Sequence, residues 1–234
     1  MATATRQRAT SAPPAEVVRS HPIPGPETAL AESERTAPPQ PPPFVTPVFL
    51  LERLATPLGQ LLLATDEQGR LRAVDWHDHE ESMRRLLRRQ YTGTAIELRE
   101  ASAVSPARRA MQAYFDGEIN VIDTLEVATG GTEFQRAVWT ALRTIPGGET
   151  LSYRELAIRL GRASATRAVG LANGANPVSI VVPCHRVIGS NSTLTGYGGG
   201  LPRKQWLLDH ERRWWVAQHP STPGASIQLT LGLA

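Results

Sequence analysis

Cysteine and lysine are almost absent from this sequence of 234 residues, which has Cys184 as its only cysteine and Lys204 as its only lysine. A single cysteine excludes an intramolecular disulfide and any zinc site that needs several cysteines, and we predict neither a metal nor a cofactor. We find no secretory signal and no apolar run long enough to cross a membrane. A lone thiol that must stay reduced is typical of the cytosol, so we expect a cytoplasmic protein that does not contact membranes.

Both ends of the chain differ in composition from its middle. Residues 1–47 are rich in Pro, Ala, Thr and Ser and show neither a helical nor a strand period, so we predict a disordered, partly polyproline tail. Residues 217–234 are predicted to form a second loose tail. Between the tails we expect two domains, 48–128 and 129–216.

The first domain has the pattern of strands joined by turns and followed by helices. Apolar runs on both sides of the turn signal DEQG (66–69) predict a β-hairpin. Residues 80–91 and 105–118 have helical periodicity. We identify no catalytic group in this small mixed domain, because His77 and His79 have too few nearby partners to form a metal site.

Two capping boxes mark helix starts in the second domain. Thr132 with Gln135 and Ser152 with Glu155 each place a hydroxyl residue three positions before a Gln or Glu, and an apolar helical stripe follows each pair. Gly161 is placed to end the second helix, and a third helix follows at once. Two short helices around a tight turn predict a helix-turn-helix.

The third helix, which Ser164 is predicted to cap, has a surface of small residues. Its predicted inner face consists of Ala165, Ala168, Val169 and Ala172. Its predicted outer face consists of Arg167, Gly170, Asn173 and Gly174. A helix that reads bases in the major groove needs several long polar side chains, whereas one cation on a nearly bare face suits the minor groove of DNA. Tight packing against another helix is the alternative interpretation.

Cys184 follows the β-branched run VSIVV, which predicts a buried strand. Its thiol is either a small buried hydrophobe or a nucleophile, and a nucleophilic thiol needs a base or a positive charge nearby. His185 is adjacent in sequence, which favours a water-bridged proton path over direct contact. Glu211, from the last predicted helix, could orient His185 as the carboxylate does in a catalytic triad.

Positive charge is concentrated in the second domain. Residues 131–215 carry eleven Lys and Arg against five Asp and Glu, whereas residues 48–130 carry ten against thirteen. The excess indicates either a polyanionic partner or an ordinary solvated surface.

Six segments are informative when they are taken together: FQRAVWTALRTIPGGETLSYRELA, RAVG, NP before the β-branched run, IVVPCHRVIG, GYGGG and KQWLLDHE. Together they resemble the O6-alkylguanine-DNA alkyltransferase family, the methylated-DNA–protein-cysteine methyltransferases, and most closely its bacterial stand-alone form. The resemblance is dense over 132–211 and looser up to Gly117, and residues 1–47 have no counterpart in it. It implies an α+β fold, with a small ribonuclease-H-like antiparallel sheet followed by a mostly helical, winged-helix-like domain that carries the helix-turn-helix.

The resemblance also implies an activity, DNA repair in a single irreversible turnover. An O6-alkylguanine would be flipped out of double-stranded DNA, bound through the minor groove by a monomer, and its alkyl group would move to Cys184. His185 would be the base, acting through a water, and Glu211 its partner. Tyr153 would turn the 3′ phosphate and serve guanine N3, and Asn176 would tie the helix-turn-helix to the active-site segment.

The remaining implied residues hold the flipped base and the DNA. Arg167 would fill the gap left by the base, Tyr197 would wall the pocket, and the Gly198 N–H would lie near guanine O6. The carbonyl groups of Cys184 and Val187 would accept the exocyclic amine. The implied DNA-contacting set is completed by Arg186, Ser164 and Thr166. The chain departs from the family at Gly198, where members often carry Ser or Ala.

Two functions of other classes fit the same residues. A non-catalytic binder or regulator of alkylated DNA could use the same helix-turn-helix, and methylation of Cys184 would exclude it. A cysteine hydrolase could use the same nucleophile, and a reaction that stops after one turnover would exclude that.

Overall fold

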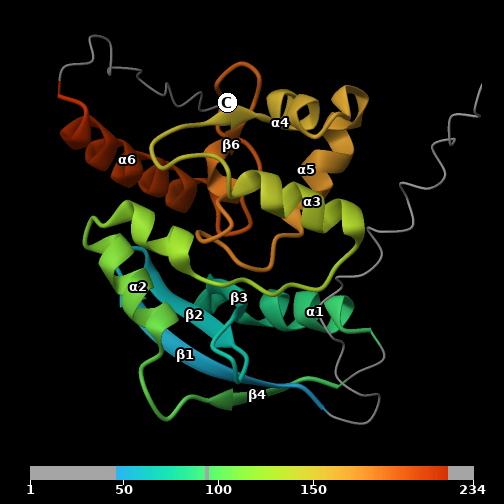
Figure 1. Ribbon diagram of the computed structural model, residues 1–234, viewed down its shortest axis with the longest axis vertical. Helices are drawn as coiled ribbons and strands as arrows, with labels where there is room; N and C mark the ends of the chain where they lie inside the picture. Colours follow the sequence, from blue (N-terminus) through green and yellow to red (C-terminus); the bar gives the residue numbers. More distant parts are fainter. Residues whose placement is uncertain (1–45, 93–94, 221–234) are drawn as a thin grey trace, which may run out of the picture. The chain divides into compact units, whose positions relative to one another are not determined.

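Four strands form one sheet in the order β3-β2-β1-β4 in the computed structural model, which describes residues 46–92 and 95–220 (Figure 1). They are β1 (Val48–Thr56), β2 (Gly59–Thr65), β3 (Leu71–Trp76) and β4 (Glu97–Glu100). The β1–β2 and β2–β3 pairs are antiparallel, and β4 is parallel to β1. The predicted hairpin is confirmed: the Asp66 carboxylate accepts the N–H groups of Gln68 and Arg70 and closes its turn.

The unbroken apolar run in β2 reflects a sheet that is covered on both faces. Leu61 and Leu63 belong to the larger core, together with α2 (Pro106–Phe115). Leu62 points the other way, into a second core that contains two residues of α1 (Glu80–Gln90). Alternate side chains of a strand face opposite sides, so two covered faces require consecutive leucines.

The second half contains four α-helices and a two-stranded parallel sheet. The helices are α3 (Glu133–Leu142), α4 (Tyr153–Arg159), α5 (Thr166–Gly174) and α6 (Leu201–Gln218). The strands are β5 (Leu151–Ser152) and β6 (Val187–Ile188). Both predicted capping boxes are confirmed, and Gly161 follows α4 with a φ of 67°, a conformation that favours glycine.

Four short 3₁₀ turns complete the described elements. They are η3 (His77–His79), η4 (Ile119–Thr124), η5 (Ala163–Ala165) and η6 (Cys184–Arg186). Two histidines of η3 lie beside carboxylates, with His77 3.5 Å from Glu80 and His79 3.9 Å from Asp78. Within residues 46–92 and 95–220 no group of three side chains could hold a metal ion, and no helix is long and apolar enough to cross a membrane.

Three details of the predicted helix-turn-helix region are wrong. Ser164 lies in the exposed turn η5 and does not cap α5, whose N-cap residue is Ala165. The turn η5 delays the start of α5 to Thr166, one residue after the predicted start at Ala165. The predicted faces of α5 are wrong at two positions, because Ala168 is exposed and Asn173 is only 3 % exposed.

The run VSIVV is buried as predicted, but it is not a strand. Only Val178 bridges to a strand, β3, through hydrogen bonds that join Val74 to Pro177 and Ser179. The chain then turns sharply at Ile180, whose φ of 72° is unusual for a β-branched residue. This irregular path joins the two halves and places Cys184 beside the edge of the sheet.

The ends of the chain are only partly described. Residues 1–45 and 221–234, which hold most of the two predicted tails, lie outside the described residues. The last helix continues to Gln218 and so includes the first two residues of the predicted second tail. The domain division at 128–129 stays a prediction.

Candidate active site

Glu211 in the middle of α6 is fully buried and gathers hydrogen-bond donors from three other parts of the chain. Its Oε1 accepts the Tyr114 hydroxyl at 2.9 Å and lies 2.9 Å from Nε2 of His185. The Arg186 guanidinium donates to both carboxylate oxygens at 2.9 Å, and the Gly148 N–H donates to Oε2 at 3.3 Å. Burial alone would raise the pKa of Glu211, but His185 and Arg186 hold it far below its usual range, so the carboxylate is ionised.

His185 is oriented by this carboxylate and kept neutral by its burial. Burial lowers the pKa of His185, and the attraction of Glu211 only partly opposes that effect. An ionised carboxylate can only accept, so Nε2 carries the proton and donates it to Oε1. The other ring nitrogen, Nδ1, is therefore a free lone pair, and it is buried without a partner among the described residues.

Cys184 precedes His185 in the turn η6 and is 6 % exposed. Burial raises the pKa of the thiol, although hydrogen bonding to Asn176 and the charge of Lys204 lower it in part. The resting sulfur is therefore protonated at neutral pH. A nucleophilic reaction at this site must remove its proton during the reaction.

Asn176 fixes the turn that leads from α5 to Cys184. Its Oδ1 accepts the Val178 N–H at 3.0 Å, and its Nδ2 donates to the Val182 carbonyl at 2.8 Å. One side chain thus connects the end of the helix-turn-helix to the segment before the thiol. The contacts agree with the place that the resemblance implied for Asn176.

Lys204 is a buried cation that sequence reasoning did not assign to the site. Its ammonium group donates to the carbonyl groups of Val187 at 2.5 Å and Thr195 at 2.6 Å. Burial lowers its pKa to about 8, and the nearby Cys184 opposes the shift. The Val187 carbonyl keeps a second lone pair for the amine predicted to bind there. The signal in the sequence was a single lysine in a chain otherwise rich in arginine.

Two tyrosines and a glycine loop surround the cysteine. Tyr197 lies with its ring centroid 6.5 Å from that of His185, and its hydroxyl is buried without a partner among the described residues. Tyr153 begins α4, with its hydroxyl 3.4 Å from the Gly196 carbonyl. A Cβ added at Gly198 would meet nothing within 4 Å, whereas one at Gly199 would lie 2.3 Å from Trp76 Nε1. The loop has room for a side chain at Gly198 and none at Gly199.

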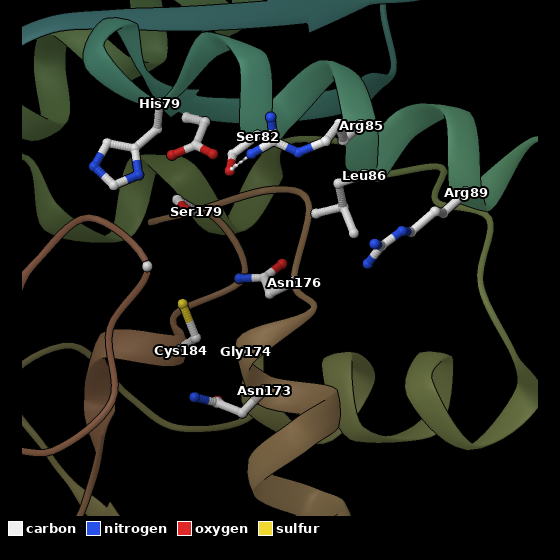
Figure 2. Close-up of a pocket in the computed structure, with 12 residues that line it drawn as sticks. His79, Ser82, Arg85, Leu86, Arg89, Asn173, Gly174, Asn176, Ser179 and Cys184 are labelled. Carbon is white, nitrogen blue, oxygen red and sulfur yellow. Dashed lines mark hydrogen bonds between the residues drawn. The ribbon is translucent and has the colours of Figure 1, made fainter.

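The cysteine opens into a cavity of about 350 Å³ that both halves of the chain build (Figure 2). The second half contributes Cys184, Asn173, Gly174, Asn176, Ser179 and Gly198. The first half contributes Asp75, His79, Ser82, Arg85, Leu86 and Arg89. The first domain, in which the sequence indicated no catalytic group, thus supplies one wall of the cavity.

The residues predicted to contact DNA separate into exposed and buried groups. Arg167 in the first turn of α5 is exposed, Ser164 is exposed and Thr166 is partly exposed. Leu171, one turn after Arg167, is 71 % exposed. Arg186 is 2 % exposed and is held by Glu211, so the prediction that it contacts DNA is wrong. Its guanidinium also donates to the Ile145 carbonyl, which fixes it inside the core.

The fold and site define a protein whose first half forms a mixed four-stranded sheet with helices. Its second half carries the helix-turn-helix and buries a cysteine next to a histidine held by a carboxylate. Residues 51–129 match the family model of the 6-O-methylguanine DNA methyltransferase ribonuclease-like domain, and residues 133–213 match that of its DNA-binding domain. The chain belongs to the 6-O-methylguanine DNA methyltransferase family.

Individual relatives agree with this membership. The chain is 56 % identical over 163 residues to a methylated-DNA–protein-cysteine methyltransferase of Salmonella typhimurium, which covers 70 % of this chain and 95 % of the relative. It is 45 % identical over 156 residues to one from Methanosarcina acetivorans, covering 67 % and 94 %. A crystal structure of Mycobacterium tuberculosis OGT in complex with DNA is similar at 39 % identity and a TM-score of 0.58, covering 71 % of this chain and 94 % of that one.

Proposed function

We propose that this chain is a DNA repair methyltransferase in which Cys184 accepts the alkyl group of O6-alkylguanine from duplex DNA. The new Sγ–carbon bond forms as the bond between that carbon and O6 breaks, and the base leaves as ordinary guanine with the electron pair and a proton. The product is a thioether, which no described residue is placed to cleave, so the protein acts once.

The observation that carries this proposal is the unpartnered Nδ1 of His185 next to a buried, protonated thiol. A neutral imidazole whose other nitrogen is bound to an ionised carboxylate is the arrangement of a general base. The thiol proton passes through a water to Nδ1, and Glu211 stabilises the imidazolium that forms. The same proton then goes to the departing guanine.

DNA binding uses the exposed side of α5. This side carries one cation, Arg167, with Ala168, Leu171 and Gly174, so it approaches the minor groove closely and reads little sequence. Arg167 occupies the space of the flipped guanine, and Tyr153 turns the 3′ phosphate. The base enters the cavity between Tyr197 and the Cys184 segment.

The protein acts as a monomer in the reducing cytosol, because one copy contains all the proposed groups and its acceptor must remain a thiol. The decisive experiment is intact-protein mass spectrometry after mixing with duplex DNA that carries one O6-methylguanine. The expected result is a single added methyl on the peptide that contains Cys184. An unchanged mass with retained DNA binding would instead favour a non-catalytic lesion binder, and repeated turnover would favour a hydrolase.

A further inference from the structure

The wall of the cavity opposite Cys184 is formed by α1, a helix whose arginines fall on two different sides. Arg85 and Arg89 border the cavity that contains Cys184 (Figure 2). Arg84 and Arg88 border a separate cavity with Tyr91. The four arginines of α1 thus form two pairs, one that faces the Cys184 cavity and one that faces away from it.

Arg89 is the cation on this wall that has no acidic partner among the described residues. Arg85 donates to Ser82 at 2.7 Å and lies 3.5 Å from Glu81, and Arg84 pairs with Glu80 at 2.6 Å. Arg89 is exposed and also borders an adjoining cavity, near the start of α3, so it stands where the two hollows meet. Asp75, half-buried, is the one carboxylate in the wall of the Cys184 cavity.

We infer that Arg89, assisted by Arg85, binds the sugar–phosphate backbone of the DNA strand that carries the alkylated base. A base whose O6 reaches Sγ of Cys184 fills this cavity, so its backbone must lie at the cavity rim, and an unpaired guanidinium there neutralises a phosphate. The inference rests on the proposed function for its ligand. It assigns to the first domain a part in holding DNA, in addition to the helix-turn-helix of the second.

The competing explanation is that Arg88 and Arg89 only stabilise α1, because cations in the last turn of a helix interact favourably with its dipole. That effect applies equally to both residues. Arg88 is therefore a matched control: it is exposed, lies on the same helix turn, loses the same charge on substitution, and faces away from the Cys184 cavity.

The test uses the full chain with Cys184→Ala as background, so that the lesion complex does not react. Binding to a fluorescein-labelled duplex with one O6-methylguanine is followed by anisotropy over a series of NaCl concentrations. Arg89→Gln should lower the slope of log affinity against log salt by about one and weaken binding roughly threefold to tenfold near physiological salt. Arg89→Glu should weaken it further, and Arg88→Gln should match the background protein.

If Arg88→Gln and Arg89→Gln lost DNA affinity equally, the loss would reflect net charge alone, and the inference would be overturned. It would also be overturned if neither variant lost affinity. Failure of the proposed function is recognised separately, because it appears as absence of methyl uptake by the wild-type protein. The salt slopes decide the role of Arg89 in either case.

Discussion

Replacing Glu211 by Gln removes the one charge on which the buried cluster depends. The carboxylate accepts hydrogen bonds from Tyr114, His185, Gly148 and two nitrogens of the Arg186 guanidinium. Gln keeps one accepting oxygen and turns the other into an NH₂ donor, which then faces donors. Arg186 is left as a buried cation without a counter-charge, so the variant is not the mild, nearly isosteric change that its shape suggests.

Breaking a buried ion pair by removing one partner costs about 3–5 kcal/mol. That is a large part of a typical stability of about 5–15 kcal/mol, so Glu211→Gln should fold but melt at a temperature lower by roughly 6–20 °C. The control is Asp209→Asn on the same helix, whose carboxylate accepts only the Gln205 amide, at 2.9 Å, among the residues that the structure describes. Urea unfolding and thermal melts of wild type and both variants measure the difference at neutral pH.

Acidification gives the same prediction a second readout. The pKa of Glu211 is depressed in the folded state, so its stabilisation is complete above its ordinary value of 4.5 and is lost as pH falls from there through the folded value. The stability gap between wild type and Glu211→Gln should therefore narrow in acid. A variant as stable as Asp209→Asn, or a gap that does not change with pH, would refute the buried ion pair.

Three further predictions test the acceptor, the DNA-binding helix and the loop. Cys184→Ala should abolish methyl uptake from labelled DNA while duplex affinity stays within about twofold, since the thiol contacts no phosphate; residual uptake would contradict the acceptor role. Arg167→Ala should slow repair of duplex DNA far more than reaction with free O6-benzylguanine, because only the duplex requires unstacking, which costs a few kcal/mol; equal losses would indicate a structural Arg. Gly199→Ala should destabilise the fold by about 1–3 kcal/mol through its clash with Trp76, whereas Gly198→Ala should change stability by less than about 0.5 kcal/mol; equal melting temperatures would show that the loop simply shifts.

Sequence patterns predicted the elements whose stability is local. The capping boxes at Thr132 and Ser152 and the turn at Asp66 are each closed by hydrogen bonds within four residues. The strand Glu97–Glu100 was missed because its residues, ELRE, are polar, and its place depends on backbone pairing with β1. The run VSIVV was misassigned for the opposite reason: its composition fits a strand, but contacts with β3 and Asn176 impose turns.

The site, too, has residues that the sequence could predict and contacts that it could not. Cys184, His185 and Glu211 could be proposed from the sequence because a thiol beside a base is a chemical pattern that needs no coordinates. The surroundings of Glu211 could not, since Tyr114 and Arg186 lie 97 and 25 residues from it in the chain. For the same reason, the sequence did not show that α1 forms a wall of the cavity. It also led to the prediction that Arg186 contacts DNA, because arginine is a common residue type on DNA-binding surfaces.

Arg186 gives the buried cluster its function as well as its stability. A lone carboxylate beside His185 would raise the pKa of the imidazole and favour the charged form, which has no lone pair to accept a proton. Arg186 neutralises that carboxylate through two hydrogen bonds, and together with burial it keeps His185 neutral. In the proposed mechanism, Glu211 is already ionised and oriented when the thiol proton arrives at Nδ1, so the new positive charge is stabilised without rearrangement. In the proposed mechanism, the buried Glu–Arg pair thus helps to set the protonation state of the base, even though such a pair adds little net stability over an apolar core.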